Sequence, residues 1–250
     1  MVRALLVRGM LIGILAGLLT FGFLKVYGEP QVDIAIAFET QMDLAKEAAE
    51  KAKGMPVHEE PELVSRQVQA SIGLFTAVMV YCTAFGGLFG LAFAFAYGRV
   101  PGLLAPQAVS LLLAAAGFVA IYLVPNLKYP ANPPSIGDPA TIKIRTVLYF
   151  SMIAISVAAM FGAFAFRRLL VGRFGDWNAN FIVAAYYLVI VVVAGLLLPA
   201  VNEVPAQFPA VVLWKFRMAS LGAQFIMWTT LGVVFGAFAE RAFVGGKAHA

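Results

Sequence analysis

The side chains best suited to bind a metal ion gather in three short segments between long apolar runs. Amide and carboxylate oxygens are ligands of hard divalent cations, and a histidine beside carboxylates suits Co²⁺ or Ni²⁺. On this chemistry the candidate metal ligands are Glu203, Asn202, Asp138, Asn132, His58 and Glu59. No cofactor is expected to be bound permanently, so a metal ion would be cargo.

Glu203 is the sharpest of these candidates, because it follows Pro199 at the end of an apolar run. A carboxylate left in lipid costs about 2.5–3.5 kcal/mol. Glu203 should therefore face a polar cavity or pair with Lys215 or Arg217. A structural ion pair is one interpretation, and a gate or cation site is the other.

The first polar segment offers two further alternatives. Residues 54–62 carry two prolines and three carboxylates beside His58, which fits either a solvated acidic turn or a cation site. Just before it, apolar residues recur every three or four positions over residues 31–53, which predicts an amphipathic helix. This helix would lie on the membrane or cap the bundle, or its acids would line an antechamber that collects metal.

Two Lys-x-Arg sequences follow the other two polar segments and open the next apolar runs. The segment from Pro125 to Pro139 contains five prolines, which forbid a continuing helix. It should fold back across the mouth of the bundle, with Thr141 capping the helix after it. The residues expected to anchor these loops, by pairing with carboxylates or carbonyls, are Lys143, Arg145, Lys215 and Arg217.

The elements that position these residues follow from composition. The chain has 250 residues, of which 62% are hydrophobic and 12% are charged, and its mean hydropathy is +0.87. A soluble domain is about 45–50% apolar and about 25% charged. Such a chain must have lipid as its solvent, and only helices or closed barrels span lipid.

Six charge-free runs are long enough to span a bilayer as helices. The expected spans are residues 4–25, 70–97, 103–124, 146–166, 181–200 and 218–239. The first run starts with positive charge but is too long for a signal peptide, and no cleavage site follows, so we interpret it as an anchor. The predicted fold is all-α: one transmembrane domain, a polytopic helical bundle with proline-rich outward loops.

Basic residues in the short connectors set the orientation. With six spans, Arg8, Arg99, Arg173 and Arg241 all fall on one side, which the positive-inside rule makes cytoplasmic. Both termini should therefore be cytoplasmic, with the longer polar loops outside. The formal charge of +5 is explained by these flanking residues, and binding to nucleic acid is not expected.

A repeat divides the spans into pairs. Phe-Gly pairs occur at residues 89–90, 161–162 and 235–236, separated by 72 and 74 residues, near the inner ends of the even-numbered spans. A steady period suggests repeated units, so we expect three helical hairpins in parallel orientation. The alternative is that Phe and Gly are simply common in membrane helices.

An enzyme is not indicated. The sequence contains no P-loop, no nucleophile elbow and no zinc-protease motif, and it has two histidines and one cysteine. Apart from Arg8 and Lys25 in the first, the expected spans also lack Asp, Glu, Lys and Arg. A proton-driven carrier usually places an ionisable residue near mid-membrane, so a self-contained proton antiporter is not expected.

At its outward loops the sequence resembles the CbtA family of probable cobalt transporter subunits. The matching segments are Gly28-Glu29-Pro30, Ser65-Arg66, Leu123-Val124-Pro125, Lys128-Tyr129-Pro130, Gly137-Asp138-Pro139, Asn202-Glu203-Val204-Pro205 and Leu213-Trp214. This resemblance implies a bacterial inner-membrane protein that imports Co²⁺ for cobalamin synthesis. It also implies a small single-span partner, CbtB, with a His-rich terminus, which would supply the imidazole ligands that this chain nearly lacks.

Two functions remain open at this point. The first is a divalent-metal permease subunit, with metal entering from the periplasmic side past Asp138, Asn132, Asn202 and Glu203. The second is a membrane scaffold or assembly factor that does not transport but holds a metal-binding partner.

Overall fold

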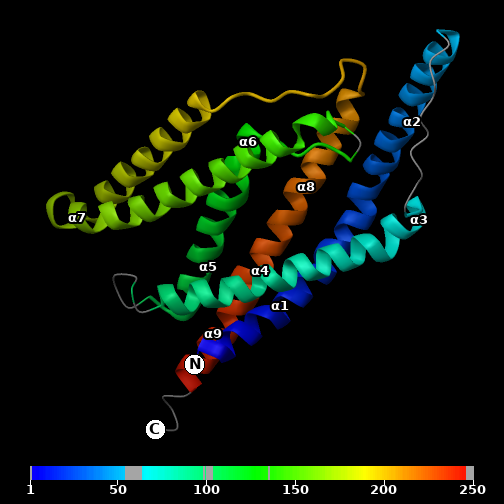
Figure 1. Cartoon of the computed structure of the whole chain (residues 1–250). Helices are drawn as coiled ribbons and strands as arrows, with labels where there is room; N and C mark the ends of the chain where they lie inside the picture. Colours follow the sequence, from blue (N-terminus) through cyan, green and yellow to red (C-terminus); the bar gives the residue numbers. More distant parts are fainter. Residues whose placement is uncertain (1, 54–63, 98, 100–103, 135, 246–250) are drawn as a thin grey trace. The chain divides into compact units, whose positions relative to one another are not determined.

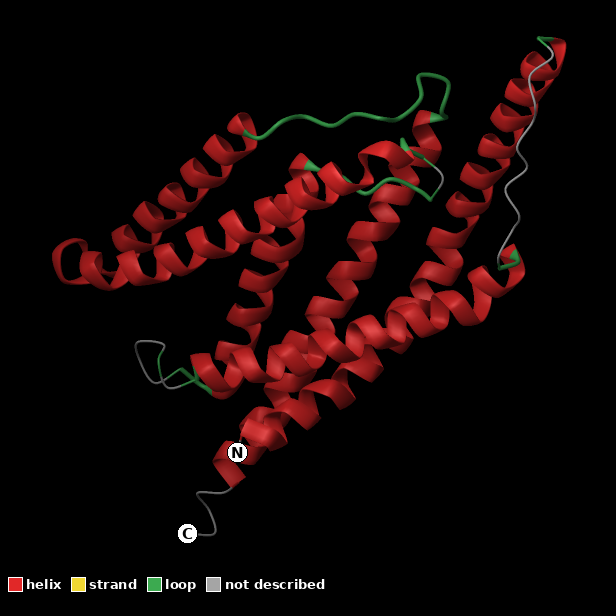
Figure 2. Cartoon of the chain, in the orientation of Figure 1, coloured by secondary structure: helices red, strands yellow, loops and turns green. Residues whose placement is uncertain are grey.

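The computed structural model describes residues 2–53, 64–97, 99, 104–134 and 136–245. Every regular element in this part of the chain is a helix (Figures 1 and 2). This outcome confirms the prediction of an all-α protein. It follows from the solvent, because lipid offers backbone groups no hydrogen-bond partner and a helix satisfies them internally.

Five helical stretches in the described residues are long and apolar enough to cross a membrane. They are Val2–Ala52, Arg66–Ala96, Pro106–Lys128, Ile142–Leu197 and Ala210–Arg241. The chain is therefore a membrane protein of the predicted polytopic kind.

The fourth stretch, α7 (Ile142–Leu197), is two helical arms rather than one rod. Gly175 has a non-helical conformation with φ 74° and ψ 168°, and the arms on either side of it run next to each other (Figure 1). An unbroken helix of 56 residues would be about 84 Å long, whereas a bilayer core is about 30 Å thick. The two arms correspond to the fourth and fifth expected spans, and the count of six stays a prediction.

The chain divides into two compact units, which we describe separately. Unit 2 comprises residues 115–131 and 137–203. Its core joins Met152 and Ala159 of the first arm of α7 to Tyr187 and Val191 of the second. The hydroxyls of Ser156 and Tyr187 are 2.7 Å apart and hydrogen-bond between the arms.

The bend of α7 is held by Arg167, which donates to Asp176 at 2.6 Å and to Asn180 at 2.7 Å. Unit 2 also contains η3 (Phe118–Leu123) and α6 (Val124–Lys128), which both contact α7. The fourth expected span thus packs against the fifth and also against the end of the third. The grouping into three equivalent hairpins stays a prediction.

Unit 1 comprises residues 1–114, 132–136 and 204–250. In it α1 (Val2–Phe23) packs closely against α4 (Leu74–Ala96). A Cβ atom added to Gly13 would lie 2.3 Å from the carbonyl oxygen of Cys82, and one added to Gly86 would lie 2.2 Å from that of Gly9. The two backbones touch, as small residues allow in membrane helices.

The first expected span does not end at the membrane edge. α1 continues through a π turn, η1 (Leu24–Gly28), into α2 (Glu29–Ala52) without a break. The helix expected at residues 31–53 is thus an extension of the first span. Only its base is packed: Ala35 and Phe38 contact Phe208 and Val212, whereas Met42 is exposed.

The return to the membrane starts with α3 (Arg66–Val68) and η2 (Gln69–Gly73), which lead into α4. Lys25 Nζ donates to the carbonyl oxygen of Ala70 at 2.8 Å and ties η1 to η2. The last described helices are α8 (Ala210–Thr230), η5 (Leu231–Phe235) and α9 (Gly236–Gly245), of which α8 contacts α1. Ser110 of α5 (Pro106–Gly117) donates to the carbonyl oxygen of Gly232 at 2.8 Å.

The contact between α1 and α4 leads to a stability prediction. Gly86→Ala should lower the stability by about 1–3 kcal/mol, because the added methyl group overlaps a backbone oxygen. Gly22→Ala is the matched control, because a Cβ there meets nothing within 4 Å and alanine favours a helix by about 1 kcal/mol. Thermal unfolding of detergent-purified protein measures both variants. Equal midpoints for the two variants would contradict the backbone contact.

A carboxylate clasp at the outer loops

Glu203 lies at the centre of a hydrogen-bonded cluster in unit 2. Thr141 Oγ1 donates to Glu203 Oε1, and the backbone N–H of Asp138 donates to Oε2 at 3.0 Å. Arg145 Nε lies 3.2 Å from Oε2 in an ion pair. We call Glu203, Thr141, Asp138 and Arg145 the Glu203 clasp. It joins the loop after the second arm of α7 to the segment that precedes the first.

The segment before α7 is shaped to present donors to this carboxylate. Gly137 has φ 134°, a conformation that L side chains rarely adopt. A Cβ atom at Gly137 would lie 2.9 Å from Arg145 Nη1 and 3.0 Å from Glu203 Oε2. Asp138 Oδ1 accepts from the N–H of Ala140 at 2.8 Å and stabilises the turn that leads into α7.

The clasp favours the charged form of Glu203. The hydrogen bond from Thr141, then the backbone N–H of Asp138 and the positive charge of Arg145 lower its pKa below the usual 4.5, against a smaller opposing effect of desolvation. Hydrogen bonds and a positive charge around a carboxylate act in this direction. Glu203 is therefore ionised at neutral pH, and both of its oxygens have partners.

The ion-pair partner of Glu203 is a correction to the sequence-based expectation. Arg145 makes the pair, whereas Lys215 or Arg217 was expected. The turn at Gly137 causes the difference, because it brings the start of α7 to the carboxylate. Arg145 thus anchors a loop. Lys143 and Lys215 are exposed.

Arg217 has a different partner, within unit 1. Its Nη2 donates to Asn132 Oδ1 at 3.0 Å, so it anchors the middle of the second proline-rich loop. Asn132 is half-buried, and Asn202 is exposed. Of the six candidate metal ligands, the described structure therefore brings together Asp138 and Glu203, and Asp138 contributes its backbone N–H to that contact.

Further hydrogen bonds fix the second loop. Tyr129 Oη donates to the carbonyl oxygen of Pro199 at 2.8 Å, and Asn126 Oδ1 accepts from the N–H of Ala131 at 3.1 Å. Sequence reasoning gave Thr141 only a capping role. A single threonine carries no signal that it will contact a carboxylate 62 residues away.

The carboxylates at the base of α2 also have ion-pair partners. Arg66 Nη2 lies 2.6 Å from Glu29 Oε2 and 2.9 Å from Asp33 Oδ1. Among the described residues, no group of three or more His, Cys, Asp or Glu side chains is placed to hold a metal ion. His58 and Glu59 lie outside the described residues.

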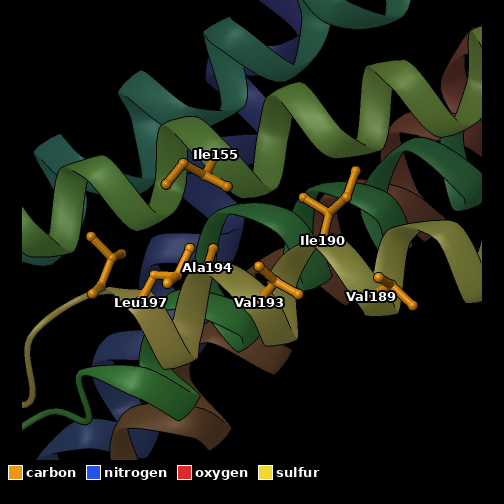
Figure 3. A pocket seen from close by; sticks show the side chains of 7 residues that line it. Ile155, Val189, Ile190, Val193, Ala194 and Leu197 are labelled. Atoms are coloured by element: carbon orange, nitrogen blue, oxygen red, sulfur yellow. The ribbon is translucent and has the colours of Figure 1, made fainter.

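An open apolar groove lies along the second arm of α7, within unit 2 (Figure 3). Its volume is about 540 Å³, and its lining is entirely aliphatic: Ile155, Val189, Ile190, Val193, Ala194, Leu197 and Leu198. Such a lining offers an ion no oxygen, nitrogen or sulfur ligand. It suits hydrocarbon, so the polar chemistry of unit 2 is concentrated at the Glu203 clasp.

The long apolar helices and the clasped outer loop define a polytopic helical membrane protein. The family model described as "Probable cobalt transporter subunit (CbtA)" matches residues 2–240 of the chain. The chain therefore belongs to the CbtA family, which confirms the resemblance seen in the outer loops. No curated protein and no solved structure matches the chain.

The lowered pKa of Glu203 gives a pH-dependent stability prediction. A carboxylate with a lowered pKa contributes stability above its ordinary pKa of 4.5, and that contribution is lost as the pH falls through the lowered value. The midpoint of thermal unfolding should therefore be higher for the wild type than for Glu203→Gln at about pH 7. The difference should shrink as the pH falls below 4.5.

Glu47→Gln is the control for this experiment, because Glu47 makes an exposed pair with Lys51 at 3.8 Å. Such pairs contribute little to stability. A gap between the wild type and Glu203→Gln that stays constant across the acidic range would contradict the clasp.

Proposed function

We propose that the chain is the membrane subunit through which Co²⁺ enters the cell, and that its two proline-rich loops form the outer entrance. Membership of the CbtA family supports cobalt as the cargo. The proposal also takes six spans from the charge-free runs, an inner-membrane location from the family and cytoplasmic termini from the charge pattern of the connectors. The loops would then face the periplasm.

The observation that carries this proposal is the Glu203 clasp. An ionised carboxylate stands in the loop that follows α7, and the facing segment holds it with two hydrogen-bond donors and the guanidinium of Arg145. Because both oxygens are engaged and Arg145 balances the charge, Glu203 acts by positioning the entrance. The carboxylate of Asp138 and the amides of Asn202 and Asn132 provide further oxygens on these loops.

The chemistry of the loops favours a partner that supplies stronger ligands. Selective binding of Co²⁺ is favoured by imidazole nitrogen, and the chain contains two histidines. We propose that a small single-span, His-bearing subunit of the CbtB kind delivers metal to the entrance, and that the imported cobalt serves cobalamin synthesis. The description of the family as a transporter subunit supports a complex.

A second function is a scaffold or assembly factor that holds such a partner and does not itself transport. The absence of a ready ligand cluster among the described residues favours it. The two functions differ in whether ions pass through this chain.

Radiotracer ⁵⁷Co²⁺ uptake in cells with and without the chain tests the proposal. We expect Glu203→Gln to lower uptake about tenfold, as is usual when a group that supports a metal site is changed. Thr141→Val, which removes only the hydroxyl that contacts Glu203, should lower it in the same direction. Glu47→Gln, on the exposed face of α2, should leave it unchanged.

The amount of folded protein in the membrane must be equal for all variants, as measured by size-exclusion chromatography of a fluorescent fusion. Full uptake by Glu203→Gln at equal protein levels would favour the scaffold. Uptake that does not depend on the chain at all would exclude the permease.

A further inference from the structure

A polar group stands inside the spans of unit 1, away from the outer loops. Gln224 and Trp228 lie one turn apart on α8, and Gln224 Nε2 donates to the hydroxyl of Tyr81 on α4 at 3.2 Å. The rings of Trp228 and Phe85 are nearly perpendicular, with centroids 6.0 Å apart. α4 and α8 thus meet through these side chains, within the helical stretches that could cross the membrane.

Two atoms of this group are buried without a hydrogen-bond partner: Gln224 Oε1 and Trp228 Nε1. Only 6% of Trp228 is exposed. Turning the amide of Gln224 around would pair its oxygen with Tyr81 and leave the nitrogen without a partner instead. A buried polar group without a partner is costly.

α8 is also irregular just beyond this group. The N–H of Leu231 is shared between the carbonyl oxygens of Met227 and Trp228, and a π turn, η5, starts there. Ser110 then satisfies the carbonyl of Gly232 inside the π turn. Single π turns inside long helices occur frequently at functional sites, so the irregularity is independent support for a role of this region.

The ligand that fits these atoms follows from their chemistry. Gln224 Oε1 is an acceptor and Trp228 Nε1 is a donor, and one turn of helix separates them. A bare cation would be repelled by the N–H group, whereas a water molecule can accept from it and donate to the amide oxygen. Small divalent cations give up their water reluctantly, so such an ion would meet this group through its water shell.

The same face of α8 leads to the outer loops. Arg217 and Gln224 are seven residues apart, which places them on one side of the helix. Arg217 is bonded to Asn132 of the second proline-rich loop. Arg217, which contacts that loop, and Gln224 therefore lie on the same side of α8.

We propose that Gln224, Trp228 and Tyr81 form a station inside the membrane past which a divalent cation moves with its water shell. The inference rests on the proposed transport function and adds where the ion passes. In the present packing its two unpaired atoms are buried, whereas Tyr81 is 42% exposed. Separation of α4 from α8 by the width of a hydrated ion would let water reach both atoms.

Cysteine labelling tests the station directly. The only cysteine, Cys82, is first changed to alanine, and Gln224→Cys or Val80→Cys is then introduced. Val80 neighbours Tyr81 on α4 and is 65% exposed on the apolar surface, so it is the matched control. A charged, membrane-impermeant thiosulfonate should modify Gln224→Cys at least about tenfold faster than Val80→Cys, because only a thiol in contact with water ionises and reacts.

Addition of Co²⁺ should slow the modification of Gln224→Cys and leave Val80→Cys unchanged. Equal rates at the two positions, or an unreactive Gln224→Cys, would overturn the station; the latter is expected if a partner helix covers this face instead. If Co²⁺ did not slow the modification of Gln224→Cys, water but not the ion would reach this position. That result would also overturn the station. Because labelling needs no transport, failure of the station and failure of the proposed function are distinguishable.

Trp228→Phe supplies a second test, in which the thermal midpoint and cobalt uptake should change in opposite directions. The change removes the buried N–H and keeps an aromatic ring, so the thermal midpoint should rise, because an unpaired donor is lost. Cobalt uptake should nevertheless fall about threefold, because the same donor is absent in the open state. A lower midpoint with unchanged uptake would show that Trp228 has only a packing role.

Discussion

The structure depends on one constraint: a polar group inside lipid must find its partner within the protein. The backbone meets this requirement by forming helices. Where a helix departs from regular geometry, a side chain compensates, as Ser110 does at Gly232 and Lys25 does at Ala70. Two ion pairs of unit 2 lie at its turns: Arg167 with Asp176 at the bend of α7, and Arg145 with Glu203 at the loops.

Glu203, in the loop that follows α7, meets the same requirement. Its carboxylate is held by a hydroxyl, a backbone N–H and a guanidinium. The ion pair with Arg145 balances its negative charge. Together these contacts fix the loop after α7 to the segment that precedes α7.

Sequence reasoning located the helices because long apolar runs without charge can be read directly from the sequence, and such runs predict spanning helices. The basic residues between the fourth and fifth spans indicated that these are two helices, and the structure places the bend at Gly175 between them. Sequence reasoning missed the continuity of α1 and α2, because Gly28 and Pro30 normally end a helix. The π turn at Leu24–Gly28 places Pro30 in the first turn of α2, where a missing N–H does no harm. The partners of Glu203 depend on how two distant loops fold, and local pattern cannot encode that.

The unbroken path from α1 into α2 has a mechanical consequence. α2 has 24 residues, so its far end stands about 36 Å from the π turn. A tilt of α1 by about 10° would sweep that end through about 6 Å at this helical rise. Because α1 is locked to α4 by backbone contact, the two would rock together. α2 is thus a lever, whose far end moves when α1 and α4 tilt together.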